Sequence, residues 1–178
     1  MTTTKATRRD GDGLAAWMTL LQAQSMVVDA ISGDLERGRR VPLPWFEVLI
    51  QLASAPEGRL KMQELAHSVL LSKSGVTRLV DRMVDVGLVS RGACATDRRV
   101  VYAMVTPEGR DALRGALPIH AESLERHFSN VLTPAELGTL RTMLRKVLDA
   151  GGFAPAPCPA VMPDEVAATP RERARVSR

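Results

Sequence analysis

The stretch from Ser72 to Val105, "SKSGVTRLVDRMVDVGLVSRGACATDRRVVYAMV", constrains the fold of this chain more than any other. Its first half carries apolar residues every three or four positions, at Val76, Leu79, Val80, Met83 and Val84. This spacing predicts an amphipathic helix, because such residues share one face of a helix. Ser72 is positioned to cap the start of this helix with its hydroxyl, and Gly87 is positioned to end it with a positive φ.

Two β-rich runs follow the helix, "LVSR" (88–91) and "VVYAMV" (100–105). The polar residues between them end in Asp97, Arg98 and Arg99. Two short runs of this kind around a polar turn predict a β-hairpin.

Two further helices are predicted before this unit. "PWFEVLIQLASA" (44–55) is a short apolar helix that stops near a Pro-Glu-Gly turn at 56–58. "KMQELAHSVL" (61–70) is the next, with Leu65, Ala66 and Val69 facing inward. The order of three helices, a strand, a loop and a strand is that of a winged helix, in which the third helix enters the major groove of DNA.

Longer helices are predicted on both sides of this unit. Thr106 and Pro107 are typical of a helix start, and Pro118 is expected to kink the helix, which runs to about Val131. The sequence Thr-Pro-Ala-Glu at 133–136 is a capping box that begins the last helix.

Apolar stripes run along the first and last of these helices, from Leu14 to Leu35 and from Leu137 to Leu148. They suit a partner helix in a dimer, and the alternative is packing within one chain. The predicted fold is mainly α with a small β-hairpin wing: a winged helix-turn-helix at about 42–105 between N- and C-terminal dimerisation helices at about 12–36 and 106–150. Residues 1–11 are expected to be a disordered leader, and residues 151–178 a disordered tail containing Pro and Arg.

Composition narrows the classes of function. The chain has 178 residues and a net charge of +4, which mildly favours an anionic partner but does not establish nucleic-acid binding. Cys94 and Cys158 match neither a disulfide framework nor a zinc spacing, and we expect no metal and no cofactor. We find no apolar run close to the roughly 18–20 residues of a membrane span and no signal peptide, so we expect a cytoplasmic protein that contacts no membrane. No phosphate loop, supported carboxylate pair or nucleophile motif is visible, so we expect no enzyme.

The polar residues of the 72–87 helix and of the hairpin are the candidate contacts to double-stranded DNA. Their chemistry suits phosphates, base edges or the minor groove: Ser72, Lys73, Ser74, Thr77, Arg78, Arg82, Arg98 and Arg99. Lys73 and Arg78 can bind phosphate or guanine, and Arg82 is better placed for the backbone. Asp97 is expected to orient a neighbouring arginine. The alternatives are a solvated helix face and a surface hairpin with a local ion pair.

Five segments carry a resemblance to a known family: "WFEVLIQLA" (45–53), "ELA" (64–66), "VTRLVDRMVDVGLVSR" (76–91), "DRR" (97–99) and "VTPEGRDAL" (105–113). Through them the chain, from about Asp12 to Ala150, resembles the MarR family of bacterial transcription regulators. The resemblance implies a homodimer with two winged-helix lobes that read a pseudo-palindromic DNA site. It also implies that Asp97 and Arg99 form a supporting pair and that Arg98 makes the contact at the tip of the wing, although the two arginines could exchange roles.

In this family a small, often phenolic, anion commonly lowers DNA affinity. Trp17, Met18 and Trp45 are the candidates for contacting such an effector, with core or interface packing as the alternative for each. The expected function is a homodimeric DNA-binding regulator, a repressor relieved by a small molecule. The alternative is a winged helix that binds a protein, and affinity that falls steeply with salt would distinguish the two.

Overall fold

The computed structural model describes residues 3–39, 41–69, 73–93 and 100–152, and within these ranges the side chains from residue 11 onward apart from that of Lys73. Within these residues the α-helices are α1 (Thr3–Arg39), α2 (Leu43–Ser54), α3 (Met62–Ser68), α4 (Lys73–Asp85), α5 (Pro107–His127) and α6 (Pro134–Ala150). The strands are β1 (Arg59–Lys61), β2 (Val89–Ala93) and β3 (Val101–Val105), and short 3-10 turns span Pro56–Gly58 and Ser129–Val131. The mainly α fold with a small β-hairpin is therefore confirmed.

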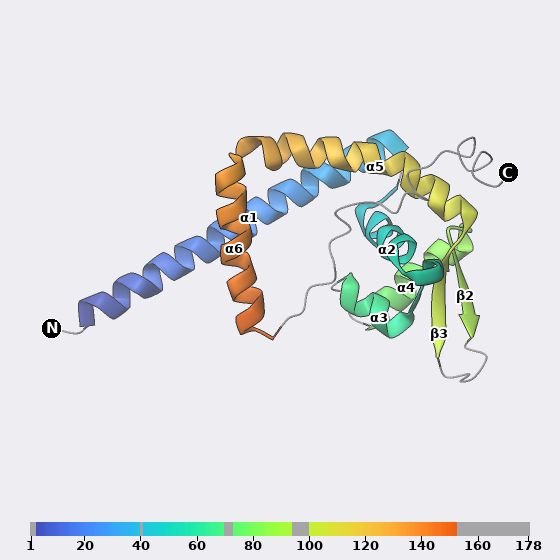
Figure 1. Ribbon diagram of the computed structural model, residues 1–178, viewed down its shortest axis with the longest axis horizontal. Coiled ribbons are helices and arrows are strands. Elements are labelled where there is room, and N and C mark those ends of the chain that lie inside the picture. Colours follow the sequence, from blue (N-terminus) through green and yellow to red (C-terminus); the bar gives the residue numbers. More distant parts are fainter. Residues whose placement is uncertain (1–2, 40, 70–72, 94–99, 153–178) are drawn as a thin grey trace.

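The molecule has two parts that α5 connects (Figure 1). A lobe contains α2, α3, α4 and the three strands, while α1 and α6 lie on the other side of the molecule. The second half of α1 packs against α5, and Ile31 and Leu35 of α1 belong to the buried core of the lobe. The lobe and the long helices thus share one core at the C-terminal end of α1.

The sheet has the strand order β1-β3-β2, with both pairings antiparallel. Val89 of β2 lies opposite Val105 of β3, and Ala93 lies opposite Val101, so the hairpin predicted from residues 88–105 is confirmed. The sequence did not reveal β1. Its three residues contain one partly buried side chain, Leu60, which is too short a pattern to distinguish a strand from a loop.

α4 buries the face that its spacing predicts, since Val76, Val80 and Met83 are fully buried. The helix ends at Asp85, and Gly87 just after it has φ 78°. The amide of Gly87 donates to the Val84 carbonyl at 2.9 Å, and the amide of Leu88 donates to the Met83 carbonyl at 2.9 Å. This pair of bonds is the Schellman motif, which turns the chain sharply from α4 into β2.

Both predicted helix caps of the C-terminal half are confirmed. The Thr106 hydroxyl accepts the Gly109 amide at 2.9 Å, and the Thr133 hydroxyl accepts the Glu136 amide at 3.3 Å. The Glu136 carboxylate accepts the Thr133 amide at 2.8 Å, which lowers the pKa of Glu136. Pro118 lies inside α5, and Figure 1 shows α5 changing direction along its length. α5 ends at His127, earlier than expected, because the chain tightens into the 3-10 turn before α6.

The N-terminal helix is longer than the sequence suggested. α1 begins at Thr3, so residues 3–11 continue the helix where we expected a disordered leader. No proline lies between Thr3 and Arg39, and extending an existing helix costs less than starting one. Residues 153–178, and with them most of the expected tail, lie outside the described part of the chain.

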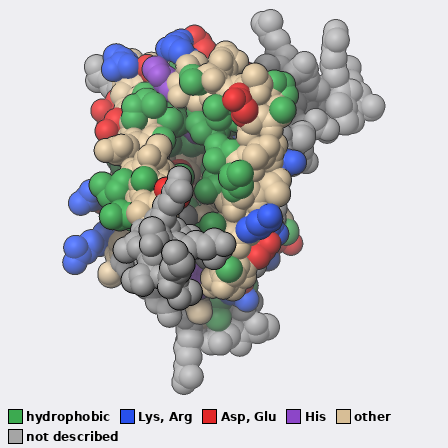
Figure 2. Space-filling view, turned by 90° about the vertical axis from the view of Figure 1, so that its left-hand side faces the viewer, with side chains coloured by type: hydrophobic (Ala, Val, Ile, Leu, Met, Phe, Trp, Pro, Cys, Tyr) green, Lys and Arg blue, Asp and Glu red, His purple; other side chains and the backbone are tan. Residues whose placement is uncertain are grey.

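α1 contains a segment that the absence of an uninterrupted apolar run did not indicate. The segment Gly11–Arg39 is long and apolar enough, by length and composition, to cross a membrane. The segment contains scattered polar residues, but its mean hydropathy is still that of a helix able to cross a membrane. Its apolar side chains are largely exposed, as are those of α6; the exposed set is Leu14, Trp17, Met18, Leu20, Leu21, Met26, Met143 and Val147. Figure 2 views the molecule from the left-hand side of Figure 1 and shows hydrophobic side chains gathered around a hollow.

Candidate nucleic-acid interface

The outer face of α4 presents polar side chains to solvent. Ser74, Thr77, Arg78 and Arg82 are exposed, on the side opposite the buried valines. α3 and α2 pack behind α4, so its inner face is occupied by the lobe. α4 begins at Lys73, and Ser72, the expected cap, lies outside the described residues. The structure therefore brings four of the predicted contacts onto one exposed face of α4.

A contact between α4 and β2 was not anticipated from the sequence. The Arg91 Nη2 lies 3.0 Å from the Asp81 Oδ1 and donates to the Thr77 carbonyl at 3.3 Å. The three residues belong to two elements and are separated by up to 14 positions, so no periodicity reports the contact. Asp81 is an acidic residue on the otherwise basic polar face of α4.

The two strands of the hairpin extend away from the core beside α4 (Figure 1). Ala93 and Val101 form the outermost pair of the hairpin register. The wing residues beyond that pair, including Cys94, Asp97, Arg98 and Arg99, lie outside the described residues. Their predicted roles in binding and support stay predictions.

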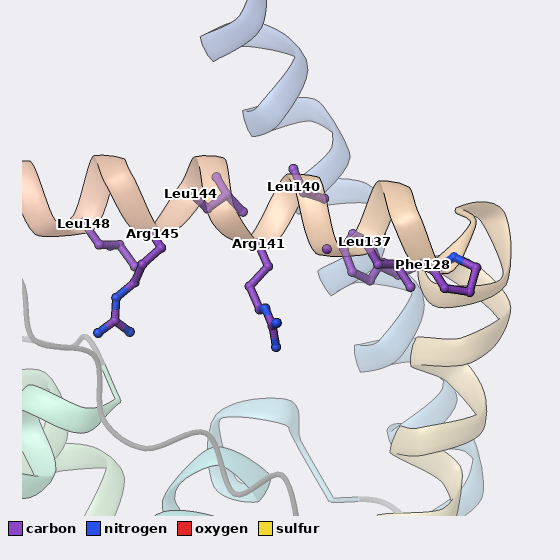
Figure 3. A pocket seen from close by; sticks show the side chains of 9 residues that line it. Phe128, Leu137, Leu140, Arg141, Leu144, Arg145 and Leu148 are labelled. Atoms are coloured by element: carbon purple, nitrogen blue, oxygen red, sulfur yellow. The ribbon is translucent and has the colours of Figure 1, made fainter.

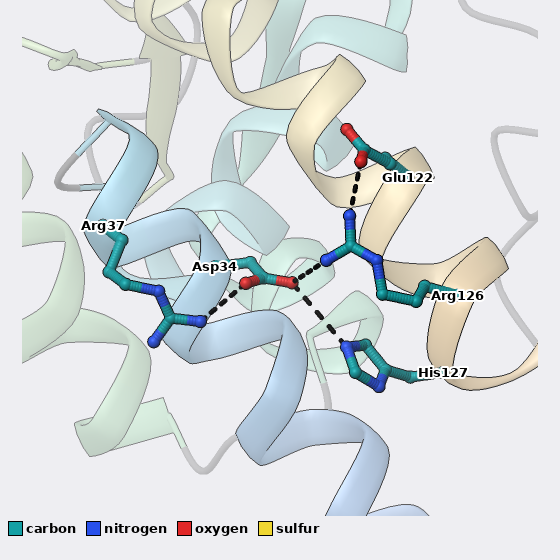
Figure 4. A network of polar contacts seen from close by, with 5 residues as sticks. All are labelled: Asp34, Arg37, Glu122, Arg126 and His127. Carbon is teal, nitrogen blue, oxygen red and sulfur yellow. Dashed lines mark hydrogen bonds and ion pairs between the residues drawn. The ribbon is translucent and has the colours of Figure 1, made fainter.

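A cluster of charged residues joins α1 to α5 (Figure 4). Asp34 on α1 accepts from the Arg37 Nη2 at 2.6 Å, and its Oδ2 lies 3.6 Å from the Arg126 Nη1 and 3.9 Å from the His127 Nε2. Arg126 also pairs with Glu122. Asp34 is thus shared between its own helix and the end of α5, and no spacing in the sequence indicates this tertiary contact.

The same carboxylate lies beside the buried hydroxyl of Ser123. Ser123 and then Arg37 hold the pKa of Asp34 below its usual value. Neither the Asp34 Oδ2 nor the Ser123 Oγ has a hydrogen bond of ordinary geometry within the described residues. The lowering of the Asp34 pKa by Ser123 therefore comes from the nearness of the Ser123 hydroxyl to the Asp34 carboxylate. A small cavity of about 270 Å³ opens here, lined by these two residues and by Arg37, Gly38, Ile119, Glu122 and Arg126.

A larger groove of about 660 Å³ follows α6 (Figure 3). Leu137, Leu140, Leu144 and Leu148 line it, together with Phe128 and two arginines. Figure 3 shows Arg141 and Arg145 extending from the same side of α6. The groove is therefore apolar with a cationic margin, and it continues the exposed apolar surface of α6.

The residues proposed to contact an effector lie in two environments. Trp17 and Met18 are on the exposed part of α1, with 55% and 48% of their surface accessible. Trp45 instead packs against the core from α2. Their role as effector contacts stays a prediction.

The histidines of α5 have structural neighbours. His120 stacks on Phe46 of α2, with ring centroids 4.4 Å apart and planes inclined by 15°. Burial lowers the pKa of His120. His127 faces Asp34, as described above, and no group of three potential metal ligands occurs among the described residues.

A lobe of three helices and an antiparallel sheet, with a polar helix face beside a hairpin, defines a winged-helix protein. A family model described as MarR family matches residues 41–100. Over this segment the chain is similar to MarR family transcriptional regulators.

Individual regulators show the same similarity. The HTH-type transcriptional regulator MhqR of Bacillus subtilis is 32% identical over 51% of this chain and 62% of its own length. The transcriptional repressor MprA of Escherichia coli K12 is 29% identical over 58% of each protein. The chain thus spans about three fifths of the curated relatives that it matches.

Among solved structures, Sco3205 of Streptomyces coelicolor, a MarR family transcriptional regulator in complex with DNA, is 29% identical. It matches 80% of this chain and 92% of its own with a TM-score of 0.73. These relatives are transcriptional regulators and not enzymes.

Proposed function

We propose that this chain is a homodimeric, sequence-specific DNA-binding regulator that reads a pseudo-palindromic site in double-stranded DNA. The observation that carries the proposal is α4, which buries its valines in the lobe and turns Ser74, Thr77, Arg78 and Arg82 to solvent. Hydroxyl and guanidinium groups on one helix face suit phosphates and base edges. The similarity to Sco3205, solved with DNA, supports the same use of this face.

The homodimer explains the open apolar surface of α1 and α6. Leu14 is 63% exposed and Val147 is 70% exposed in the single chain, and α6 also carries a groove lined by leucines. Contiguous apolar surface of this kind typically marks an interface. A second copy of the chain supplies matching surface, because a two-fold interface is self-complementary.

The regulator acts in the cytoplasm as a repressor, and a small aromatic or phenolic effector releases it from DNA. The similarity to the transcriptional repressor MprA supports repression and not activation. An effector that binds one arrangement of the two lobes better than another shifts the population toward that arrangement. Trp17, Met18 and Trp45 are the proposed contacts.

Substitution of one arginine in each reading element tests the proposal. A duplex is first selected from a random-sequence library with the wild-type protein, and a scrambled duplex of the same composition serves for comparison. Arg78→Ala is expected to lower affinity for the selected duplex by about tenfold and to relax the sequence preference, since a base contact contributes roughly 1–3 kcal/mol. Arg98→Ala is expected to weaken binding while the circular-dichroism spectrum stays unchanged.

Lys146→Ala on α6 is the matched control, because it removes one exposed positive charge far from α4 along the chain. Equal losses for Arg78→Ala and Lys146→Ala would reject the α4 face as the reading surface. Wild-type binding that is insensitive to salt would favour the protein-binding alternative, because phosphate contacts release counterions.

A further inference from the structure

Arg91 occupies a defined place on the inner side of the hairpin. Val89 and Arg91 are two positions apart on β2, so both side chains point to the same face of the sheet. Val89 is 2% exposed, and Ala103, opposite Arg91 in the register, is fully buried. That face covers the core, and the Arg91 side chain lies at its edge, with 34% of its surface accessible.

The acceptors on α4 lie directly across from this position. Thr77 and Asp81 are one helical turn apart and therefore share a side of α4. The same Arg91 nitrogen, Nη2, approaches the Asp81 carboxylate at 3.0 Å and the Thr77 carbonyl at 3.3 Å. One cationic nitrogen thus ties a strand of the hairpin to the first turns of α4.

We propose that Arg91 and Asp81 form a positioning pair that fixes the DNA-reading face of α4 relative to the hairpin. The proposal rests on the function proposed above. Arg91 acts through α4 and makes no contact with DNA itself. Thr77, whose carbonyl accepts from Arg91, is itself one of the proposed reading residues, so the pair holds the reading face at its centre.

The charge of Asp81 supports this role. A carboxylate on a helix that faces phosphates lowers DNA affinity by repulsion, unless a nearby cation compensates it. Arg91 compensates Asp81. Asp85, one turn further along α4, makes no ion pair within the described residues and provides the contrast.

The experiment measures binding of purified full-length variants to the library-selected duplex and to the scrambled duplex over a series of salt concentrations. Asp81→Asn and Arg91→Gln are each expected to lower affinity for the selected duplex about threefold to fivefold, the scale of one partly exposed ion pair. Affinity for the scrambled duplex is expected to rise slightly in Asp81→Asn and to fall slightly in Arg91→Gln, because each variant leaves one charge uncompensated, whereas the preference for the selected duplex falls in both. Arg91→Lys is expected to restore specific binding, because an ammonium can replace the single nitrogen that makes both contacts.

Two further variants distinguish the positioning of α4 from a simple effect of net charge on DNA affinity. Asp85→Asn removes the same charge one turn away and is expected to raise affinity for both duplexes slightly. The double variant Asp81→Asn, Arg91→Gln is expected to lose no more than Arg91→Gln alone, because the two residues act as a unit.

Three results would overturn the proposal. Asp81→Asn could raise the affinity for both duplexes as Asp85→Asn does, or the losses of the two single variants could multiply in the double variant. Arg91→Gln could reduce the slope of log affinity against log salt by about 0.9, which marks a direct phosphate contact. Failure of the wild type to prefer its selected duplex would instead reject the proposed function, so the two failures are distinguishable.

Discussion

The missing side chain of Gly109 decides how closely α5 approaches the lobe. A Cβ at this position would lie 2.1 Å from the Leu88 carbonyl oxygen and 3.1 Å from Leu49. The obstacle is backbone, which cannot turn away as a flexible side chain could. Glycine at 109 is therefore a packing requirement of the junction between α5 and β2.

Gly109→Ala is expected to lower the free energy of unfolding by about 1–3 kcal/mol, because the first turn of α5 must shift to accept a methyl group. Urea denaturation followed by circular dichroism measures the change. Gly13→Ala on α1 is the control, since its Cβ would meet nothing within 4 Å. A loss in Gly13→Ala as large as in Gly109→Ala would show that the effect is not steric.

Single residues were predictable where their role is local. Thr106, Thr133 and Gly87 act on backbone groups within a few positions, so the sequence alone identified them as caps. Arg91 and Asp81 were not identified as partners, because their contact depends on how a strand lies against a helix. The Asp34 cluster escaped notice for the same reason, since three of its members come from α5.

At the scale of elements, the stacked pair His120 and Phe46 connects α5 to α2. Phe46 is 2% exposed, and burial lowers the pKa of His120. A proton therefore binds the unfolded chain more readily than the folded one, and the folded state loses stability as pH falls below about 6.5, the ordinary pKa of histidine. Above that pH both states are neutral and the effect disappears.

His120→Phe is expected to keep the ring contact and to reduce the loss of stability between pH 7.5 and pH 5.5. Thermal melts at both values measure the difference, and His67→Gln, an exposed position on α3, is the control that should behave as the wild type. This window lies above the range in which Asp34 and Glu136, whose pKa values are lowered, gain protons. An unchanged pH dependence in His120→Phe would contradict the role of this stack.

Helices with a repeated apolar stripe were predicted well, whereas the short strand β1 and the start of α1 were not. α2, α4 and α6 were evident because each buries or presents a repeated stripe. β1 has only three residues, and it is a strand only because it pairs with β3, which is distant in the sequence. The start of α1 was misplaced because polar composition predicts disorder, whereas a helix once formed extends through polar residues that lack a proline.

At the scale of the whole molecule, the proposed dimer depends on apolar side chains that a single chain leaves open. Met143 and Val147 lie one turn apart on α6 and are 59% and 70% exposed. Val147→Glu is expected to shift the protein from dimer to monomer, because it places a charge in the interface. Light scattering coupled to size-exclusion chromatography measures the mass.

Lys146→Glu introduces the same side chain at the neighbouring exposed position and is expected to stay dimeric. If both variants remain dimers, α6 does not form the interface. The sequence predicted the stripe but left open whether it packs within the chain, and only the exposure of these side chains decides against that alternative.

The junction between α4 and α5 has a mechanical consequence. The Thr106 hydroxyl donates to the Gly87 carbonyl at 2.8 Å, and the Thr106 amide donates to the Leu88 carbonyl at 3.2 Å, so the first turn of α5 is bonded to the end of α4. α5 has 21 residues and is roughly 30 Å long, so a tilt of about 5° displaces one end by roughly 3 Å relative to the other. A tilt of α5 is therefore expected to move the end of α4 with it, because these two hydrogen bonds join the helices directly.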